Sequence, residues 1–369
     1  MAANPVAIRE VVKEEWAYLV GLLPANLDEL AVTTGALRRR RAVTSGEDLL
    51  RLCLAYSLED WSLRQTAAMA QMMGWQAISD VAVLKRLRAC AGLLKELISG
   101  ILARRLEAVA RPALRVCLVD ATTVSRPGSS GSDWRLHVSF DLHALRLYGI
   151  ELTDASGGES LSRFRASPGE IYVGDRAYGT TPGVLSLLEA GAGLIVRTSL
   201  QQIRLTGPEG GSASLLAWLD RLGDAAPGEC QVEVSSKERA WPLRLVALRK
   251  SPQAAEAAMQ RARRDSARKG HATREETLVL AKFVVVLSNC EQVVTAEQIL
   301  ETYRFRWQIE LAFKRLKSLL FLDNLRARDP ALAQTYLLSK LLGALLAEEL
   351  IERAGSFSPW GYLLAPPTT

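Results

Sequence analysis

The sequence changes in character at Arg115, and this change limits the possible folds more than any other feature. Residues 1–110 are predicted to be helical, because apolar residues recur there at helical spacing. From Arg115 onward, short apolar or β-branched runs are separated by Gly, Ser, Pro and Asp, which is the pattern of strands. These runs cover residues 115–119, 134–140, 147–152, 171–173 and 194–196. With a helical segment at 181–190, the order predicts an α/β fold with a mixed sheet whose first three strands form a meander.

The composition is that of a globular, mildly basic protein. Apolar residues make up 49% of the 369 residues and the net charge is +6, which permits a nucleic-acid partner without requiring one. The five cysteines are scattered and form no C-x-x-C pair, so we expect free thiols in a reducing compartment. Because the chain has only three histidines, a zinc site of the His/Cys type is not expected. No secretory leader is recognisable, and Lys340, Glu348 and Glu349 interrupt the apolar segment 331–351. We therefore expect a core helix there, no membrane span and a cytoplasmic location.

We interpret the segment 200–288 as an insertion. It contains a Gly- and Pro-rich turn at 206–211 and alternating runs at 231–234 and 243–248. A basic helix at 260–269 follows, and a strand at 283–287 closes the segment. Thr295 then opens a long helix, which we expect to continue to residue 320.

Two aspartates follow strand-like runs and are candidates for a site. Asp120 closes the run 115–119, and Asp175 follows 171–173 at a glycine-flanked turn. Acids at the carboxyl ends of two strands lie at the sheet edge where α/β proteins place their sites, and together they suit Mg²⁺. Taken alone, each acid is better explained as a turn residue, so the interpretation as a site depends on the two acids lying together.

The helix 295–320 carries the strongest signal. At about 100° per residue, Tyr303, Arg306, Glu310 and Lys317 fall within a stripe about 60° wide. The apolar side chains occupy the rest of the helix, and they are Phe305, Ile309, Ala312, Phe313 and Leu316. Residues 303–328 contain seven cations and two acids, an imbalance that suits phosphates and a metal better than a self-neutralising surface.

These residues resemble the DDE transposases of bacterial insertion sequences, in the IS-four type branch marked by a Y-R-E-K helix. The match is closest over residues 303–317, and Asp175-Arg176 keeps the first two residues of a second motif that departs afterwards. The resemblance covers residues 115–350. It implies a ribonuclease-H-like mixed sheet with helices, a β-rich insertion before the glutamate helix and an all-α N-terminal domain.

The resemblance also implies a division of the chain. We expect a helical DNA-binding region over 1–110 and a catalytic core in two parts, 111–200 and 291–352. A β-rich insertion over 201–290 would separate the two parts, and a short tail would follow over 353–369.

The chemistry implied is metal-dependent cleavage at insertion-sequence ends followed by strand transfer into target DNA. Asp120, Asp175 and Glu310 would be the catalytic residues and would hold two Mg²⁺ ions, with Mn²⁺ as a substitute metal. The residues that would contact DNA are Tyr303, Arg306, Lys314, Lys317 and Arg176. Transposon-end DNA and target DNA would be the partners of a homodimer, associated with the nucleoid. A nuclease without strand transfer and an inactive end-binding repressor are the alternatives, and the presence of all three acids argues against the repressor.

Two further segments have open interpretations. Residues 63–74 and 78–88 look like a helix-turn-helix in which Ser79 caps a helix with a basic end, and a plain helical hairpin explains the pattern equally well. The basic helix 260–269 is either a solvated helix or a DNA contact. Trp218 and Trp241 are expected in the core of the insertion, with base stacking as the alternative.

Overall fold

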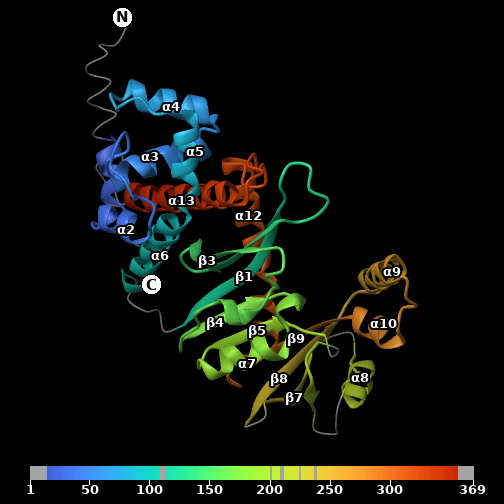
Figure 1. The fold of residues 1–369 in the computed structure, drawn as a ribbon. Coiled ribbons are helices and arrows are strands. Elements are labelled where there is room, and N and C mark those ends of the chain that lie inside the picture. The colour runs from blue at the N-terminus through green and yellow to red at the C-terminus, as the bar shows by residue number, and fades with distance from the viewer. Residues whose placement is uncertain are drawn as a thin grey trace, which may run out of the picture. The chain divides into compact units, whose positions relative to one another are not determined.

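The computed structural model describes residues 15–108, 114–199, 202–207, 212–223, 226–236 and 239–355 (Figure 1). The chain divides into two compact units. The first contains Met1–Ala110, Thr123–Arg135 and Lys314–Thr369, and the second contains Arg111–Thr122 and Leu136–Phe313. Three elements contribute residues to both units, namely β1 (Arg115–Val124), β2 (Trp134–Asp141) and α12 (Trp307–Leu320).

The first unit is built around α13 (Pro330–Gly355), which packs against α3, α5 and α6. The other helices of this unit are α2 (Leu27–Thr33), α3 (Gly46–Ser57), α4 (Leu63–Met72), α5 (Asp80–Arg88) and α6 (Ala91–Ala108). α13 is long and apolar enough to cross a membrane, but 72% of its most apolar stretch is buried inside the protein. Lys340 is buried and donates to the carbonyl oxygen of Leu320 at 2.6 Å. The expected core helix is therefore confirmed.

Serine caps begin three helices of the first unit, including the cap predicted at Ser79. Ser45 and Ser62 each form a reciprocal capping box with the third helical residue, and Ser79 accepts from the amide of Ala82. The two helices predicted around Gly74 are present as α4 and α5. Gly74 itself has φ +83°, a conformation that glycine adopts without strain. Recognition of DNA by this helix pair stays a prediction.

A nine-stranded sheet runs through the described residues in the order β3-β2-β1-β4-β5-β9-β8-β7-β6. Its remaining strands are β3 (Arg146–Asp154), β4 (Glu170–Gly174), β5 (Gly193–Arg197), β6 (Leu205–Thr206), β7 (Gly228–Ser235), β8 (Ala240–Arg249) and β9 (Phe283–Ser288). β1, β4 and β5 are parallel, whereas β5–β9, β9–β8, β8–β7 and β7–β6 are antiparallel. The mixed sheet and every predicted strand are present, and β6 is an addition.

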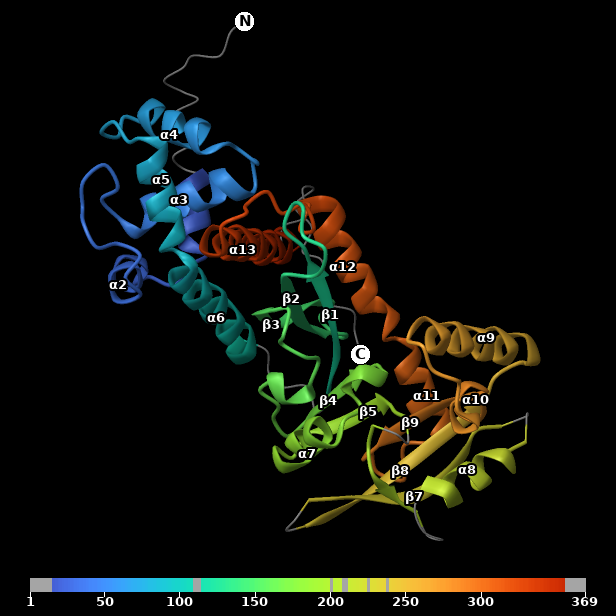
Figure 2. The same cartoon turned by 45° about the vertical axis from the view of Figure 1, so that its right-hand side comes forward.

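The segment predicted as an insertion continues this sheet. β9 pairs with β5 on one side and with β8 on the other, so the ladder is unbroken across the segment. Three helices accompany the strands, namely α8 (Ser212–Asp220), α9 (Pro252–Arg268) and α10 (Glu275–Ala281), as Figure 2 shows. The segment is therefore a mixed α/β extension, because helices make up much of it besides the expected strands.

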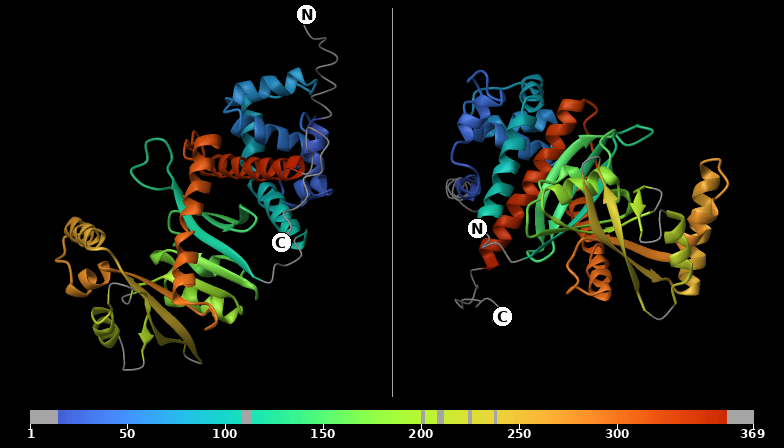
Figure 3. Two further views of the ribbon diagram at one scale, coloured as in Figure 1. Left: turned by 180° about the vertical axis from the view of Figure 1, so that it is seen from behind. Right: turned by 90° about the horizontal axis from the view of Figure 1, so that it is seen from below.

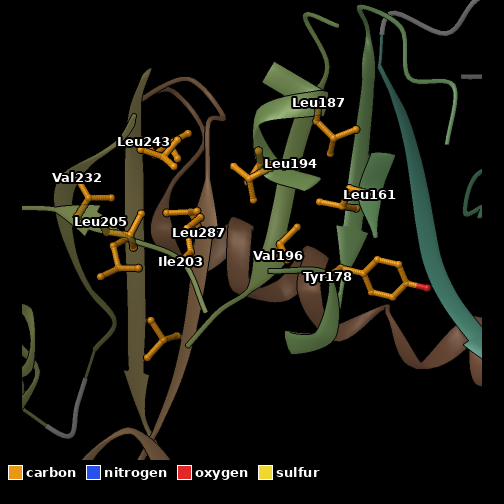
Figure 4. Packing of buried hydrophobic residues seen from close by; sticks show 14 of the residues in the cluster. Leu161, Tyr178, Leu187, Leu194, Val196, Ile203, Leu205, Val232, Leu243 and Leu287 are labelled. Carbon is orange, nitrogen blue, oxygen red and sulfur yellow. The ribbon is translucent and has the colours of Figure 1, made fainter. Parts of the chain in front are cut away.

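Helices cover both faces of the sheet in the second unit. α7 (Thr181–Glu189) lies in front of β4 and β5 in Figure 1 and contributes Leu187 to a buried cluster with Leu194 and Val196 (Figure 4). α11 (Ala296–Arg304) contacts β4, β5 and β8. The left view of Figure 3 shows the molecule from behind, with the face of the sheet that α11 covers toward the viewer. Because strand side chains alternate, Leu118 and Val173, buried outside this cluster, belong to the α11 face.

Candidate active site

The register of β1 against β4 brings Asp120 and Asp175 together. Arg115 pairs with Glu170 and Leu118 with Val173, a constant offset of 55 residues. The same offset separates the two aspartates, and the backbone of Asp175 is still extended at φ −78° and ψ −171°. Continuing the register by two residues therefore places them on adjacent strands, which lie about 5 Å apart. Because side chains two residues apart on a strand point to the same face, Asp120 and Asp175 lie on the α11 face, like Leu118 and Val173.

Asp120 lies within β1 and not at its end. The predicted strand stopped at residue 119, but β1 continues to Val124, because the run of Thr and Val after Ala121 favours an extended chain. Only 20% of the Asp120 side chain is exposed, and one carboxylate oxygen accepts from the Ala121 amide at 2.8 Å. Burial, reinforced by the negative charges of Asp175 and Glu159, raises the pKa of Asp120 to about 6.

Asp175 is a turn residue as well as a neighbour of Asp120. Its carboxylate caps the short 3₁₀-helix Arg176–Tyr178 by accepting from the Ala177 amide at 2.8 Å. Gly179 ends this turn against β5, where a Cβ would lie 2.8 Å from the carbonyl oxygen of Arg197. The two interpretations of Asp175 are thus compatible, because the turn fixes the side chain at the sheet edge.

The predicted helix 295–320 is two helices. α11 ends at Arg304 and α12 begins at Trp307, because the amides of Phe305 and Arg306 donate to carbonyl oxygens three residues back, at 3.1 Å each. Thr295 and Gln298 form the capping box that begins α11. Phe305, expected on the buried side, is 43% exposed as a consequence of the break.

Arg306 lies at this break and bridges Glu310 of α12 and Asp120 of β1. Its Nη2 is 2.6 Å from Oε1 of Glu310, and its Nη1 is 3.9 Å from Oδ2 of Asp120. Arg306 is 22% exposed and Glu310 is 57% exposed, so the bridge reaches from the sheet edge into solvent. Arg306 directly precedes α12, so its side chain reaches Glu310, four residues later in the first turn of that helix.

The other predicted residues lie around this bridge or farther along the helix. Tyr303 is half-buried in the last turn of α11, close enough to Arg306 to act on its charge. Arg176 directly follows Asp175 and is exposed. Lys314 and Lys317 belong to α12 but fall in the first unit, since the boundary between the units follows Phe313.

Glu159 is a further acid whose charge acts on Asp120, and sequence reasoning did not find it. It precedes the 3₁₀-helix Leu161–Arg163, and its charge contributes to the raised pKa of Asp120. The segment around it contains Gly, Glu and Ser without apolar periodicity, so no local pattern separates it from an ordinary loop acid.

The acids fit a hard divalent cation by their chemistry. Among the described residues, no three His, Cys, Asp or Glu side chains are already grouped as metal ligands. Asp120 and Asp175 nevertheless repel each other at a partly buried edge, and a cation relieves such repulsion. Carboxylate oxygens are the donors that Mg²⁺ and Mn²⁺ prefer. In this conformation, Arg306 supplies the positive charge between the strand and the helix.

Asp120→Asn is expected to raise the free energy of unfolding at pH 7 by about 1 to 3 kcal/mol. The pKa of Asp120 in the fold is about 6, above its ordinary value of 3.8, so the fold favours the protonated form. The stability that Asp120 contributes is therefore lost as pH rises from about 4 through 6, and the uncharged asparagine avoids this loss. Urea unfolding of both proteins at pH 4 and pH 7 measures the difference. Equal stability at pH 7 would show that Asp120 carries no burial penalty.

Comparison with known proteins connects this chain to an enzyme family. The family model described as Transposase DDE domain matches residues 111–346. The InsL protein of insertion sequence element IS186A from Escherichia coli strain K12 is 38% identical over 362 residues, covering 94% of this chain and 96% of that protein. The transposase for insertion sequence element IS421 from Escherichia coli is 38% identical with the same coverage. The transposase for element IS231F from Bacillus thuringiensis subsp. israelensis is 24% identical over 88% of this chain and 77% of its own length.

Proposed function

This chain belongs to the Transposase DDE domain family, and from that premise we propose that it cuts DNA at the ends of an insertion sequence and transfers the cut strands to target DNA. It is an insertion-sequence transposase. The observation that supports the finer proposal is the Arg306 bridge, which joins Glu310 to Asp120 beside Asp175. The strand order β3-β2-β1-β4-β5, with β1, β4 and β5 parallel, supports the expected ribonuclease-H-like core.

DDE transposase domains generally use divalent metal ions. In our proposal Asp120, Asp175 and Glu310 hold two such ions, Mg²⁺ with Mn²⁺ as a substitute. Bound there, the ions would make a water or 3′-hydroxyl oxygen a better nucleophile and stabilise the oxygen that leaves.

The protein groups have separate tasks in this proposal. Asp120 and Asp175 are fixed by β1 and by the turn after β4, so their carboxylates need little reorganisation to act as ligands. Glu310 is on a helix and is the most exposed of the three. Arg306 neutralises Asp120 and Glu310 in the free enzyme, and its guanidinium is the correct group to pair with a phosphate when DNA arrives. Tyr303, Arg176, Lys314 and Lys317 are proposed as further contacts to DNA.

Partners follow from the reaction. Transposases act on transposon-end DNA, and we propose that α4 and α5 help to recognise that end. Strand transfer also requires target DNA and two ends held together, so we propose a homodimer on DNA. The proposed location is the nucleoid in the cytoplasm.

Strand joining tests the proposed function. The full chain is incubated with Mg²⁺, a supercoiled plasmid and a duplex that carries the end of its own element, pre-cut to expose the 3′-hydroxyl. We expect covalent joining of the labelled duplex to the plasmid. Cleavage of an uncut end without joining would favour the nuclease alternative, and binding with neither reaction would favour the repressor.

A further inference from the structure

The carboxyl-terminal edge of the sheet carries cations beside the catalytic acids. Arg176 follows Asp175 at the end of β4, and Arg197 is the last residue of β5. β9 runs antiparallel to β5, and β8 runs antiparallel to β9, so β8 points in the same direction as β5. Lys250, directly after β8, therefore lies at the same edge.

These cations have no acidic partner. Among the ion pairs of the described residues, none involves Arg176, Arg197, Lys250 or Arg261. Lys250 is half-buried, and its Nζ donates to the carbonyl oxygen of Ala281 at 2.6 Å. Burial, followed by the positive charges of Arg197, Arg176 and Arg261, lowers the pKa of Lys250 to about 8. Arg176, Arg197 and Arg261 thus lie near enough to Lys250 for their charges to disfavour its protonated form, and among the described residues none of the four cations forms an ion pair.

α9 extends this group of charges. It begins directly after Lys250 with Ser251 as its cap, and it contains no buried residue. At about 100° per residue, Arg261, Arg264 and Arg268 share one face of this helix. Arg268 pairs with Asp265 at 3.2 Å, whereas Arg261 acts on Lys250. The half-buried residues of α9 face α10, and these three arginines are exposed, so packing of the helix does not account for their charge.

We propose that Arg176, Arg197, Lys250 and Arg261 form one track that binds the phosphate backbone of DNA and leads it to Asp175. The inference rests on the proposed function and adds residues from β5, β8 and α9 to its DNA-binding surface. Unpaired cations in a row attract a polyanion, which recovers the repulsion among them. The row crosses several strands and ends at the catalytic acids, which favours an extended backbone over a small phosphate compound.

The salt dependence of DNA binding tests the track. The full chain and its variant Arg197→Gln/Lys250→Gln/Arg261→Gln are titrated with a labelled duplex of random sequence at several KCl concentrations. We expect the slope of log affinity against log salt to become shallower by about 2 to 3 units, since each lost phosphate contact removes about 0.9. Arg239→Gln is the matched control, because Arg239 is exposed near the opposite end of β8 and should leave the slope unchanged.

The outcomes separate this inference from the proposed function. An unchanged slope in the triple variant would overturn the track while the proposed function stands, whereas a wild-type chain that binds no DNA would overturn both. Displacement of the duplex by inorganic phosphate as readily as by DNA of equal phosphate content would make the group a small-anion site and overturn the track.

The melting temperature and the proton uptake on binding show whether a loss of DNA binding comes from unfolding or from the loss of the cations. Removing repelling cations should not lower the melting temperature, and if the triple variant fails to fold, Lys250→Gln alone carries the test. Because DNA phosphates restore the protonated form of Lys250, wild-type binding at pH 8 should take up protons from a weak buffer. Lys250→Gln should take up fewer protons, and equal uptake by both proteins would contradict the role of Lys250.

Discussion

Asp120→Asn is expected to slow metal-dependent cleavage at least about 10³-fold, because a lost metal ligand removes several kcal/mol of transition-state stabilisation. Asp175→Asn and Glu310→Gln should have effects of the same order, since each would remove one of the three proposed ligands. The substitutions keep the shape of each side chain and remove its charge. Loss of activity therefore reports on chemistry more than on packing.

Cleavage of a labelled duplex that carries the element's own end measures this effect, with and without Mg²⁺. Binding of the same duplex should persist in all three variants, because removing a carboxylate reduces repulsion of phosphate. Glu301→Gln is the matched control, an exposed acid on α11 with no part in the proposed site. A variant that retains wild-type cleavage would remove its residue from the proposed catalytic set.

The strands could be predicted because their signal is local. Short apolar runs bounded by Gly, Pro and Asp mark extended segments wherever they occur, and β4 and β5 differ from their predicted bounds by one residue at each end. The offset of 55 residues between Asp120 and Asp175 was visible in the sequence as well. Its meaning was not, since only the pairing of Arg115 with Glu170 shows that the offset is the register of two parallel strands.

The features that were missed depend on tertiary contacts. No Pro or Gly marks the break before Trp307, so helical periodicity alone predicts a continuous helix. The place of β9 between β5 and β8 is set by pairing between segments far apart in the chain. Glu159 reaches the site through the fold of a loop. Local patterns thus predicted the elements, and the way they assemble into a site required the structure.

Arg115→Met is expected to lower the free energy of unfolding by about 3 to 5 kcal/mol, because it leaves two buried carboxylates without their cation. Arg115 is 6% exposed, with Nε 3.0 Å from Oδ2 of Asp141 and Nη1 3.5 Å from Oε1 of Glu170. Both acids are 7% exposed. Methionine fills much of the same space, so the loss is electrostatic more than a matter of volume.

Urea unfolding measures the effect against Arg163→Met, which breaks a more exposed pair with Glu151 and should cost at most about 1 kcal/mol. Similar losses in the two variants would contradict a buried role for Arg115.

Loss of the Arg115 ion pairs should also affect the proposed active site, because these pairs support the register of β1 against β4. Arg115 and Glu170 form the first rung of the parallel ladder whose continuation brings Asp120 beside Asp175. A slip of one residue between β1 and β4 would turn one acid to the opposite face of the sheet. If Asp120 and Asp175 act together as proposed, Arg115→Met should lose cleavage even at temperatures where it is still folded. Full cleavage by the folded variant would show that the apolar pairs between the two strands fix the register without Arg115.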